Sequence, residues 1–193
     1  MAKVKVMTDS LASQVAAGEV VERPSSVVKE LIENSLDAGA KSIDVIIERG
    51  GKALIKVVDD GHGMSRDDSI LSIERHATSK LIKSSDLNNI LTFGFRGEAL
   101  PSIASVSKFR LSTRQHGALV GTEILIDGGK IKDIRDSGDA PGTQVEIRSL
   151  FFNVPARKKF LRADSTEISR IETVVRIAAI SRYDVGFSLR HGK

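Results

Sequence analysis

Apolar residues in the first part of the chain recur with the period of a helix. Between residues 27 and 38 they lie on one broad helical arc, and Pro24 stands where it can begin that helix. The positions on the arc are Val27, Val28, Leu31, Ile32, Leu36 and Ala38. We therefore predict a half-buried helix over this stretch.

Beyond this helix the pattern changes to short extended runs separated by glycine-containing turns. Residues 42–47 and 53–58 predict a hairpin, and further strands are predicted at 108–113, 122–126, 130–134, 143–147 and about 185–189. Helices are predicted near residues 67–75 and about 166–180. Hairpin strands with helices grouped among them predict an α/β fold. We expect a two-layer α/β sandwich with helices packed on one face of a mixed, mostly antiparallel sheet.

Length and composition narrow the class of protein. The 193 residues contain no repeat, low-complexity tract or linker, so we expect one domain over residues 1–193. The absence of cysteine excludes disulfides, thiolate zinc sites and cysteine nucleophiles, and it suits a reducing, intracellular compartment. No signal peptide and no long uncharged apolar stretch is present, which predicts a soluble protein.

The net charge of +4 is unevenly distributed along the chain. Residues 151–193 contain nine lysines and arginines and four acidic residues, a balance of +5 that leaves −1 for residues 1–150. A basic segment of this kind can bind nucleic acid by neutralising phosphates. A solvated helix face explains the same charges at least as well.

Candidate chemistry begins in the first predicted helix. Glu30 and Asn34 are four residues apart and share one helix face. A carboxylate there can accept a proton from water, and an amide oxygen can ligate a hard cation such as Mg²⁺ without adding charge beside a triphosphate. Periodicity alone favours an ordinary solvated face over this reading.

Two glycine-containing segments indicate close approach of the backbone to a ligand. Asp59, Gly61 and Gly63 follow a predicted strand, where the carboxylate can accept a hydrogen bond from an amino group such as that of adenine. A simple turn is an equal alternative. Residues 94–100 precede a short apolar helix, and amide groups at such a helix start attract phosphate. The alternative there is an ordinary helix-capping loop.

The long polar stretch 76–96 is typical of a functional or disordered loop. Residues 75–80 at its start supply two hydroxyls and two cations that can bind phosphates as the loop closes, although a polar loop kept soluble by charge fits as well. Thr143 opens a predicted strand and can support an adenine edge or hold Asp59 and a water, whereas a strand-forming threonine is the more common explanation. No G-x-x-x-x-G-K-[ST] string occurs, which excludes a P-loop of the Walker A type.

The order of these segments is more specific than any one of them. E-x-x-x-N, D-x-G-x-G, G-F-R-G-E-A-L and G-T together resemble the Bergerat-type ATP-binding fold of the GHKL superfamily, which DNA gyrase B subunits, heat-shock chaperones, histidine kinases and MutL proteins share. Residues 77–80, 94–100 and 152–161, the last reading F-N-V-P-A-R-K-K-F-L, resemble MutL-type DNA mismatch repair proteins in particular. The resemblance covers nearly the whole chain.

The resemblance implies a role for each motif. Glu30 matches the general base that activates the attacking water, Asn34 matches the Mg²⁺ ligand, and Asp59 matches the acceptor of the adenine amine. The other matching positions shape the base pocket (Gly61, Gly63 and Thr143) or the lid that wraps the phosphates (Thr78, Ser79, Lys80, Gly94, Phe95, Arg96, Gly97, Glu98, Ala99 and Leu100), and Ala38 is a further nucleotide contact.

By the same resemblance, the protein binds Mg·ATP and hydrolyses it slowly through in-line attack of water on the γ-phosphate. ATP acts as a conformational switch: the lid closes, the N-terminal arm becomes ordered and two protomers form a homo- or heterodimer that signals to mismatch-recognition and downstream repair factors. We expect at most weak, sequence-independent DNA binding and no membrane association. The expected location is the cytoplasm, associated with the nucleoid, in a bacterium, or the nucleus in a eukaryote.

MutL-type proteins continue into a second subdomain that supplies a lysine to the γ-phosphate, then into a linker and a C-terminal dimerisation domain, whereas this sequence ends at Lys193. We therefore expect a fragment that binds nucleotide, hydrolyses ATP poorly and is mostly monomeric.

Three alternatives remain: a type II topoisomerase-like ATPase domain, a sensor kinase catalytic domain, and a DNA-binding module built on residues 151–193. The strings F-R-G-E-A-L and N-V-P-A-R argue against the first of these.

Overall fold

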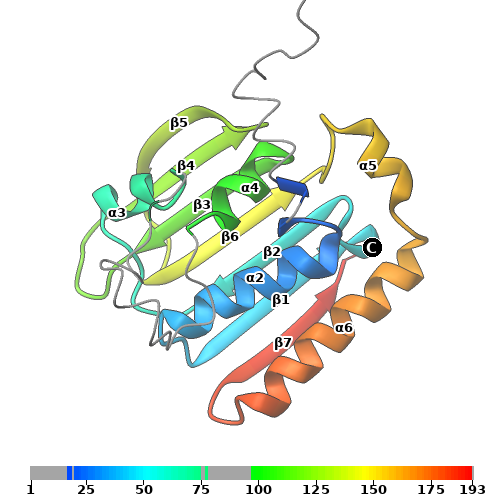
Figure 1. Ribbon diagram of the computed structural model, residues 1–193. Helices are drawn as coiled ribbons and strands as arrows, with labels where there is room; N and C mark the ends of the chain where they lie inside the picture. The colour runs from blue at the N-terminus through cyan, green and yellow to red at the C-terminus, as the bar shows by residue number, and fades with distance from the viewer. Residues whose placement is uncertain (1–16, 19, 75–76, 78–96, 193) are drawn as a thin grey trace, which may run out of the picture.

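One mixed β-sheet organises the molecule (Figure 1). The computed structural model describes residues 17–18, 20–74, 77 and 97–192. Within them the strands are β1 (Ser42–Glu48), β2 (Leu54–Asp59), β3 (Lys108–Arg114), β4 (Gly121–Asp127), β5 (Lys130–Ser137), β6 (Gly142–Arg148) and β7 (Gly186–His191). Their order in the sheet is β5-β4-β3-β6-β2-β1-β7. Only the β1–β7 pair is parallel among these strands, so the sheet is mixed and mostly antiparallel, as predicted.

Helices cover one face of this sheet. They are α2 (Pro24–Asp37), α3 (Arg66–Leu71), α4 (Ala99–Ser105), α5 (Pro155–Phe160) and α6 (Asp164–Ser181), with a 3-10 turn at Arg49–Gly51 between β1 and β2. Helices α2 and α6 pack against each other, and α4 packs on β3 and β4 (Figure 1). None of the helices in the described part of the chain combines the length and the apolar character that a membrane crossing requires.

The predicted first helix is present as α2. Pro24 occupies its first turn, and the apolar arc faces the sheet, with Val27 and Val28 fully buried. The helix ends at Asp37, and Ala38 caps it with an N–H that bonds to the carbonyl of Asn34. Ala38 is only half-buried, so it lies at the end of the buried arc rather than within it.

Residues alternate across the strands between a helical face and an open face. On β1 and β2 the buried positions toward the helices include Ile43, Val45, Ile55 and Val57. The intervening positions Asp44, Ile46, Lys56 and Val58 are half-buried and lie on the other face, which no helix covers in the described structure (Figure 1). We call these two sides the helical face and the open face.

The helix predictions differ from the structure at two places. The helix predicted near residues 67–75 is shorter, because α3 ends at Leu71. The hydroxyls of Ser69 and Ser72 bond to carbonyls three residues earlier, which competes with continued helix. Helix α5 was not predicted, since it has six residues and buries none of them, and so it has no apolar periodicity.

Candidate functional site

A row of polar side chains crosses the helical face where the apolar strands end. Asp59 on β2 lies opposite Thr143 on β6, Thr143 lies opposite Thr113 on β3, and Thr113 lies opposite Thr122 on β4. Directly opposed residues of antiparallel strands project from the same face. Two residues further into the sheet, the equivalent row consists of Val57, Val145, Leu111 and Ile124. We call Asp59, Thr143, Thr113 and Thr122 the polar row.

The carboxylate of Asp59 is the most buried acid on this face of the strands. Its Oδ2 accepts a hydrogen bond from Ser35 Oγ at 2.7 Å, and its Oδ1 accepts from the amides of Gly61 at 3.0 Å and Thr143 at 3.3 Å. Burial raises the pKa of Asp59 above its usual 3.8, although the three hydrogen bonds oppose that shift. Its partners in the described structure are neutral donors, and Oδ2, which accepts a single bond, keeps capacity to accept another from a ligand.

The glycines after Asp59 bring two backbones close together. A Cβ atom on Gly61 would lie 2.8 Å from the Cβ of Ala38, and one on Gly63 would lie 2.0 Å from the carbonyl oxygen of Arg114. Gly63 also has a φ of 66°, which side-chain-bearing residues rarely adopt. The backbone N–H of His62 donates to the carbonyl of Ala38 at 3.0 Å. The turn is thus fixed between the end of α2 and β3, and Ala38 forms one of its walls.

Glu30 and Asn34 occupy the side of α2 that leads to this turn. Together with Ala38 they are spaced four residues apart, and Ser35, next to Asn34, is the residue that bonds to Asp59. The Glu30 side chain is 29% exposed, and its Oε1 lies 3.9 Å from Lys29 Nζ. Glu30 and Asn34 therefore lie one turn apart on α2, the helix whose Ser35 bonds to Asp59. Both residues are partly exposed.

Part of the predicted lid is described and part is not. Gly97 is half-buried with a φ of 61°, and a Cβ atom on it would lie 2.4 Å from the carbonyl oxygen of Ala77, so the two flanks of the predicted loop lie together. Glu98 is the N-cap residue of α4, and Ala99 and Leu100 form its first turn. The positions outside the described residues are Thr78, Ser79, Lys80, Gly94, Phe95 and Arg96.

The string at residues 152–161 has contacts of a structural kind. Asn153 Nδ2 donates to the carbonyl of Ser105 at 2.9 Å, which joins it to the end of α4. The Arg157 guanidinium lies 5.8 Å from the ring centroid of Phe151 and packs against Gly18, where a Cβ atom would lie 1.8 Å from one of its nitrogens. None of these contacts involves a residue of the polar row.

Two contributors to the site were not predicted from the sequence, Ser35 and Thr113. Ser35 is 3% exposed within the buried arc of α2, and a lone hydroxyl among apolar helix positions is a signal that it bonds to something buried. Thr113 is 1% exposed and contacts the turn and β6. Its position as the last buried residue of a strand carries no comparable signal.

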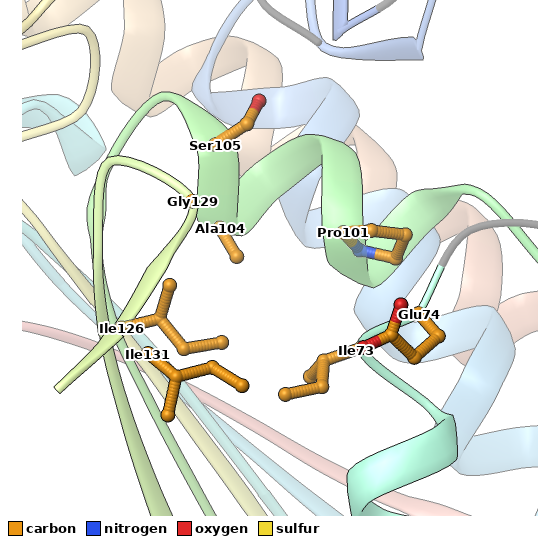
Figure 2. A pocket seen from close by; sticks show the side chains of 8 residues that line it. All are labelled: Ile73, Glu74, Pro101, Ala104, Ser105, Ile126, Gly129 and Ile131. Carbon is orange, nitrogen blue, oxygen red and sulfur yellow. The ribbon is translucent and has the colours of Figure 1, made fainter. Parts of the chain in front are cut away.

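A separate cavity lies between α4 and the β4–β5 hairpin (Figure 2). Its volume is about 190 Å³, and it is lined by Ile73, Glu74, Pro101, Ala104, Ser105, Ile126, Gly129 and Ile131. Aliphatic groups and one carboxylate suit neither phosphates nor a purine. None of the predicted site residues lines it, so we assign it no part in the candidate site.

Comparison with known proteins defines the class. Residues 22–148 match the family described as Histidine kinase-, DNA gyrase B-, and HSP90-like ATPase, and the chain belongs to this family. Within it, the sequence is similar to the DNA mismatch repair protein MutL. It is 54% identical to MutL of Opitutus terrae over 189 residues, and 57% identical to MutL of Akkermansia muciniphila over 190 residues. In both cases 98% of this chain is covered, and the chain spans about 30% of the relative's length.

Solved structures agree with this relationship. The chain matches the Aquifex aeolicus MutL ATPase domain complexed with ADP with a TM-score of 0.70 and 38% identity, over 89% of this chain and 61% of that one. It matches the N terminal domain of a DNA repair protein with a TM-score of 0.78 and 27% identity, over 93% of this chain and 52% of that one. The predicted fold and the predicted resemblance to MutL-type proteins are therefore confirmed.

Proposed function

We propose that the chain binds ATP at the polar row and along α2, and hydrolyses it slowly as the nucleotide-responsive part of a DNA mismatch repair protein. The observation that carries the proposal is the buried carboxylate of Asp59, which neutral donors hold beside a glycine turn. A buried carboxylate without a cationic partner is costly unless its lone pairs accept hydrogen bonds. The amino group of a ligand can donate the bond that Asp59 still lacks. The resemblance to an ATPase domain solved with ADP supports the same ligand class.

In this proposal the base lies against the end of the sheet. Asp59 accepts a hydrogen bond from the adenine amine, Thr143 lies beside it, and the glycine turn lets the ring approach the backbone. Ala38 provides an apolar wall next to Gly61. The ribose and phosphates then extend along α2 toward Asn34 and Glu30.

The chemistry of α2 fits the metal that such a site requires. Among the described residues no group of three or more acidic, histidine or cysteine side chains can hold a metal ion. A single amide oxygen, that of Asn34, suits Mg²⁺, which keeps several waters and takes the rest of its ligands from phosphates. When bound, the ion would neutralise charge on the transferring phosphate. Glu30 would hold the attacking water and accept its proton, at a position where its side chain is partly accessible.

The lid, the partners and the rate belong to the same proposal. Residues 97–100, with Thr78, Ser79, Lys80, Gly94, Phe95 and Arg96, would enclose the phosphates. Closure would favour homo- or heterodimerisation and contact with mismatch-recognition and downstream repair factors. We propose only weak DNA binding, through the basic residues of 151–193. ATP turnover by these 193 residues should be slow, because the solved ATPase domain they match is longer.

Calorimetric titration with a non-hydrolysable ATP analogue and Mg²⁺ tests the binding. The wild-type chain should release heat with one site, and Asp59→Asn should release none, because an amide presents a donor where the adenine amine needs an acceptor. The far-UV circular dichroism spectrum of the variant should match that of wild type. Silence from a folded wild-type chain would contradict the proposal.

Phosphate release tests the catalytic assignment separately. Glu30→Gln should keep analogue binding within about twofold and lower turnover by about 100-fold or more, since it removes only the proton acceptor. Turnover should also be lower for the 193 residues than for a longer chain that matches the full solved ATPase domain. Equal turnover in the Glu30→Gln variant would remove Glu30 from the mechanism.

A further inference from the structure

Thr113 lies at the centre of the polar row and contacts three residues in two different segments. Its Oγ1 lies 2.9 Å from the amide nitrogen of Met64, 3.1 Å from the carbonyl oxygen of Gly142 and 3.0 Å from the hydroxyl of Thr143. The residue is 1% exposed, so water does not supply alternative partners. Thr113 therefore joins the glycine turn to the first two residues of β6.

Counting hydrogens fixes the direction of each bond. A threonine hydroxyl has one hydrogen and two lone pairs. The Met64 N–H can only donate and the Gly142 carbonyl can only accept, so, with all three contacts formed as hydrogen bonds, Thr113 accepts from the first and donates to the second. Its hydrogen is then used. The Thr143 hydroxyl must therefore be the donor in its hydrogen bond with Thr113.

This direction determines what Thr143 can offer a ligand. Its hydrogen points into the protein, toward Thr113, so its oxygen presents only lone pairs outward. Thr143 is also the one threonine of the polar row that is half-buried rather than buried. Asp59, held by the Thr143 amide at 3.3 Å, is an acceptor as well. The accessible end of the row is thus a wall of adjacent acceptors.

We infer that Thr113 is a positioning residue that sets the base selectivity of the site by holding the Thr143 hydroxyl in its acceptor orientation. This inference rests on the proposed nucleotide binding at the polar row. An acceptor wall fits a 6-amino purine, whose amine donates. At the 6-position it disfavours an oxo group, whose oxygen would face other lone pairs and lose its hydrogen bond to water. Loss of the Thr113 hydroxyl frees the Thr143 hydrogen to turn outward and donate to such an oxo group.

The test compares ADP with inosine diphosphate, which has an oxo group in place of the 6-amino group. Affinities of both are measured by calorimetry with Mg²⁺ for wild type, Thr113→Val and Thr113→Ser. Wild type should prefer ADP by about tenfold or more, as expected where a site is built to bond one polar group. Thr113→Val should lower that ratio several-fold, and Thr113→Ser, which keeps the hydroxyl, should restore it.

A merely structural role for Thr113 gives a different result. Distortion of the turn would weaken both nucleotides by the same factor and leave their ratio unchanged, and that outcome would overturn the inference. Thr143→Val provides the same test without disturbing the Met64 and Gly142 contacts, and it should lower the ratio as Thr113→Val does. Thr173→Val, on α6 and outside the polar row, makes the same change of side chain as a control and should keep the wild-type ratio. If wild type binds neither nucleotide, the proposed function itself fails.

Discussion

Two buried carboxylates lie on opposite faces of the same sheet and are held in opposite ways. Asp59, on the helical face, is 9% exposed and bonds to a hydroxyl and two amides. Glu123, on the open face of β4, is 4% exposed and forms ion pairs with Arg110 and Arg135. Arg110 continues the network to Asp139 at 3.2 Å.

The difference shows that burial of a charge does not by itself mark a functional site. Both oxygens of Glu123 are engaged by guanidinium groups, so its charge is neutralised within the protein. Asp59 has no cationic partner among the described residues, and its Oδ2 has acceptor capacity unused. We therefore read Glu123 as a part of the architecture and Asp59 as a group reserved for a ligand.

The largest expected contrast is in nucleotide affinity. Asp59→Asn should weaken binding by at least about 100-fold, near 3 kcal/mol, because it removes a desolvated acceptor from the base pocket. Glu123→Gln should change affinity by less than about twofold, since the open face does not touch the base pocket. Calorimetry on both variants measures this. A comparable loss in the two variants would end the distinction between the carboxylates.

For the free energy of unfolding, the larger effect should come from Glu123→Gln rather than from Asp59→Asn. Glu123→Gln should lower the free energy of unfolding by about 2 kcal/mol, less than for a fully buried pair because Arg110 and Arg135 are partly exposed. Asp59→Asn should leave stability unchanged or raise it, since burial disfavours the charged form. Urea unfolding in the absence of nucleotide compares them. Equal destabilisation would show that Asp59 also has an architectural role.

The pH dependence of stability should also differ in sign between the two faces. Burial raises the pKa of Asp59, so its contribution is present below the usual value of 3.8 and is lost as pH rises through the folded-state pKa. The hydrogen bond from Ser112 lowers the pKa of Asp139, so its contribution is present above 3.8 and is lost as pH falls through the folded-state pKa. Relative to Asp59→Asn, wild type should gain stability on acidification. Relative to Asp139→Asn, it should lose stability, and slopes of one sign would contradict this.

Salt should produce the smallest contrast. Raising NaCl to about 1 M should narrow the stability gap between wild type and Glu123→Gln by a few tenths of a kcal/mol, because partly exposed ion pairs are screened. The gap between wild type and Asp59→Asn should change less, because the partners of Asp59 are neutral. Thermal unfolding at two salt concentrations measures both gaps. A larger salt effect on the Asp59 gap would indicate a cation near that carboxylate.

The sequence predicted most of the fold, because apolar and polar residues alternate along a strand that buries one face. The seven strands of the described sheet match the predictions within a few residues, from β1 at Ser42–Glu48 to β7 at Gly186–His191. Helix α5 was missed because an exposed helix of six residues has no apolar side to detect. The parallel pairing of β7 with β1 depends on contacts across the whole chain, which local patterns do not record.

The parts of the candidate site that lie in sequence motifs could be predicted. The parts that depend on how the strands pair could not. Asp59 and Gly61 could be singled out as candidates because an acid and a glycine after a strand are conspicuous, and the structure places Gly61 and Thr143 within hydrogen-bond distance of Asp59. Thr113 is an ordinary strand threonine until the pairing of β3 with β6 places it opposite Thr143. Its role depends on which residues face each other across strands, and that is settled only by the folded sheet.

The position of β7 has a consequence for how the chain is made. Its six residues pair in parallel with β1, and Ser188 reaches Asp44 across a separation of 144 residues. During synthesis β1 emerges early, and the strand that closes its outer edge emerges late. An unpaired edge strand is a template for pairing with other chains. Until β7 is made, β1 is therefore the edge strand on this side of the sheet, and afterwards β7, whose residues are half-buried or exposed, takes that position.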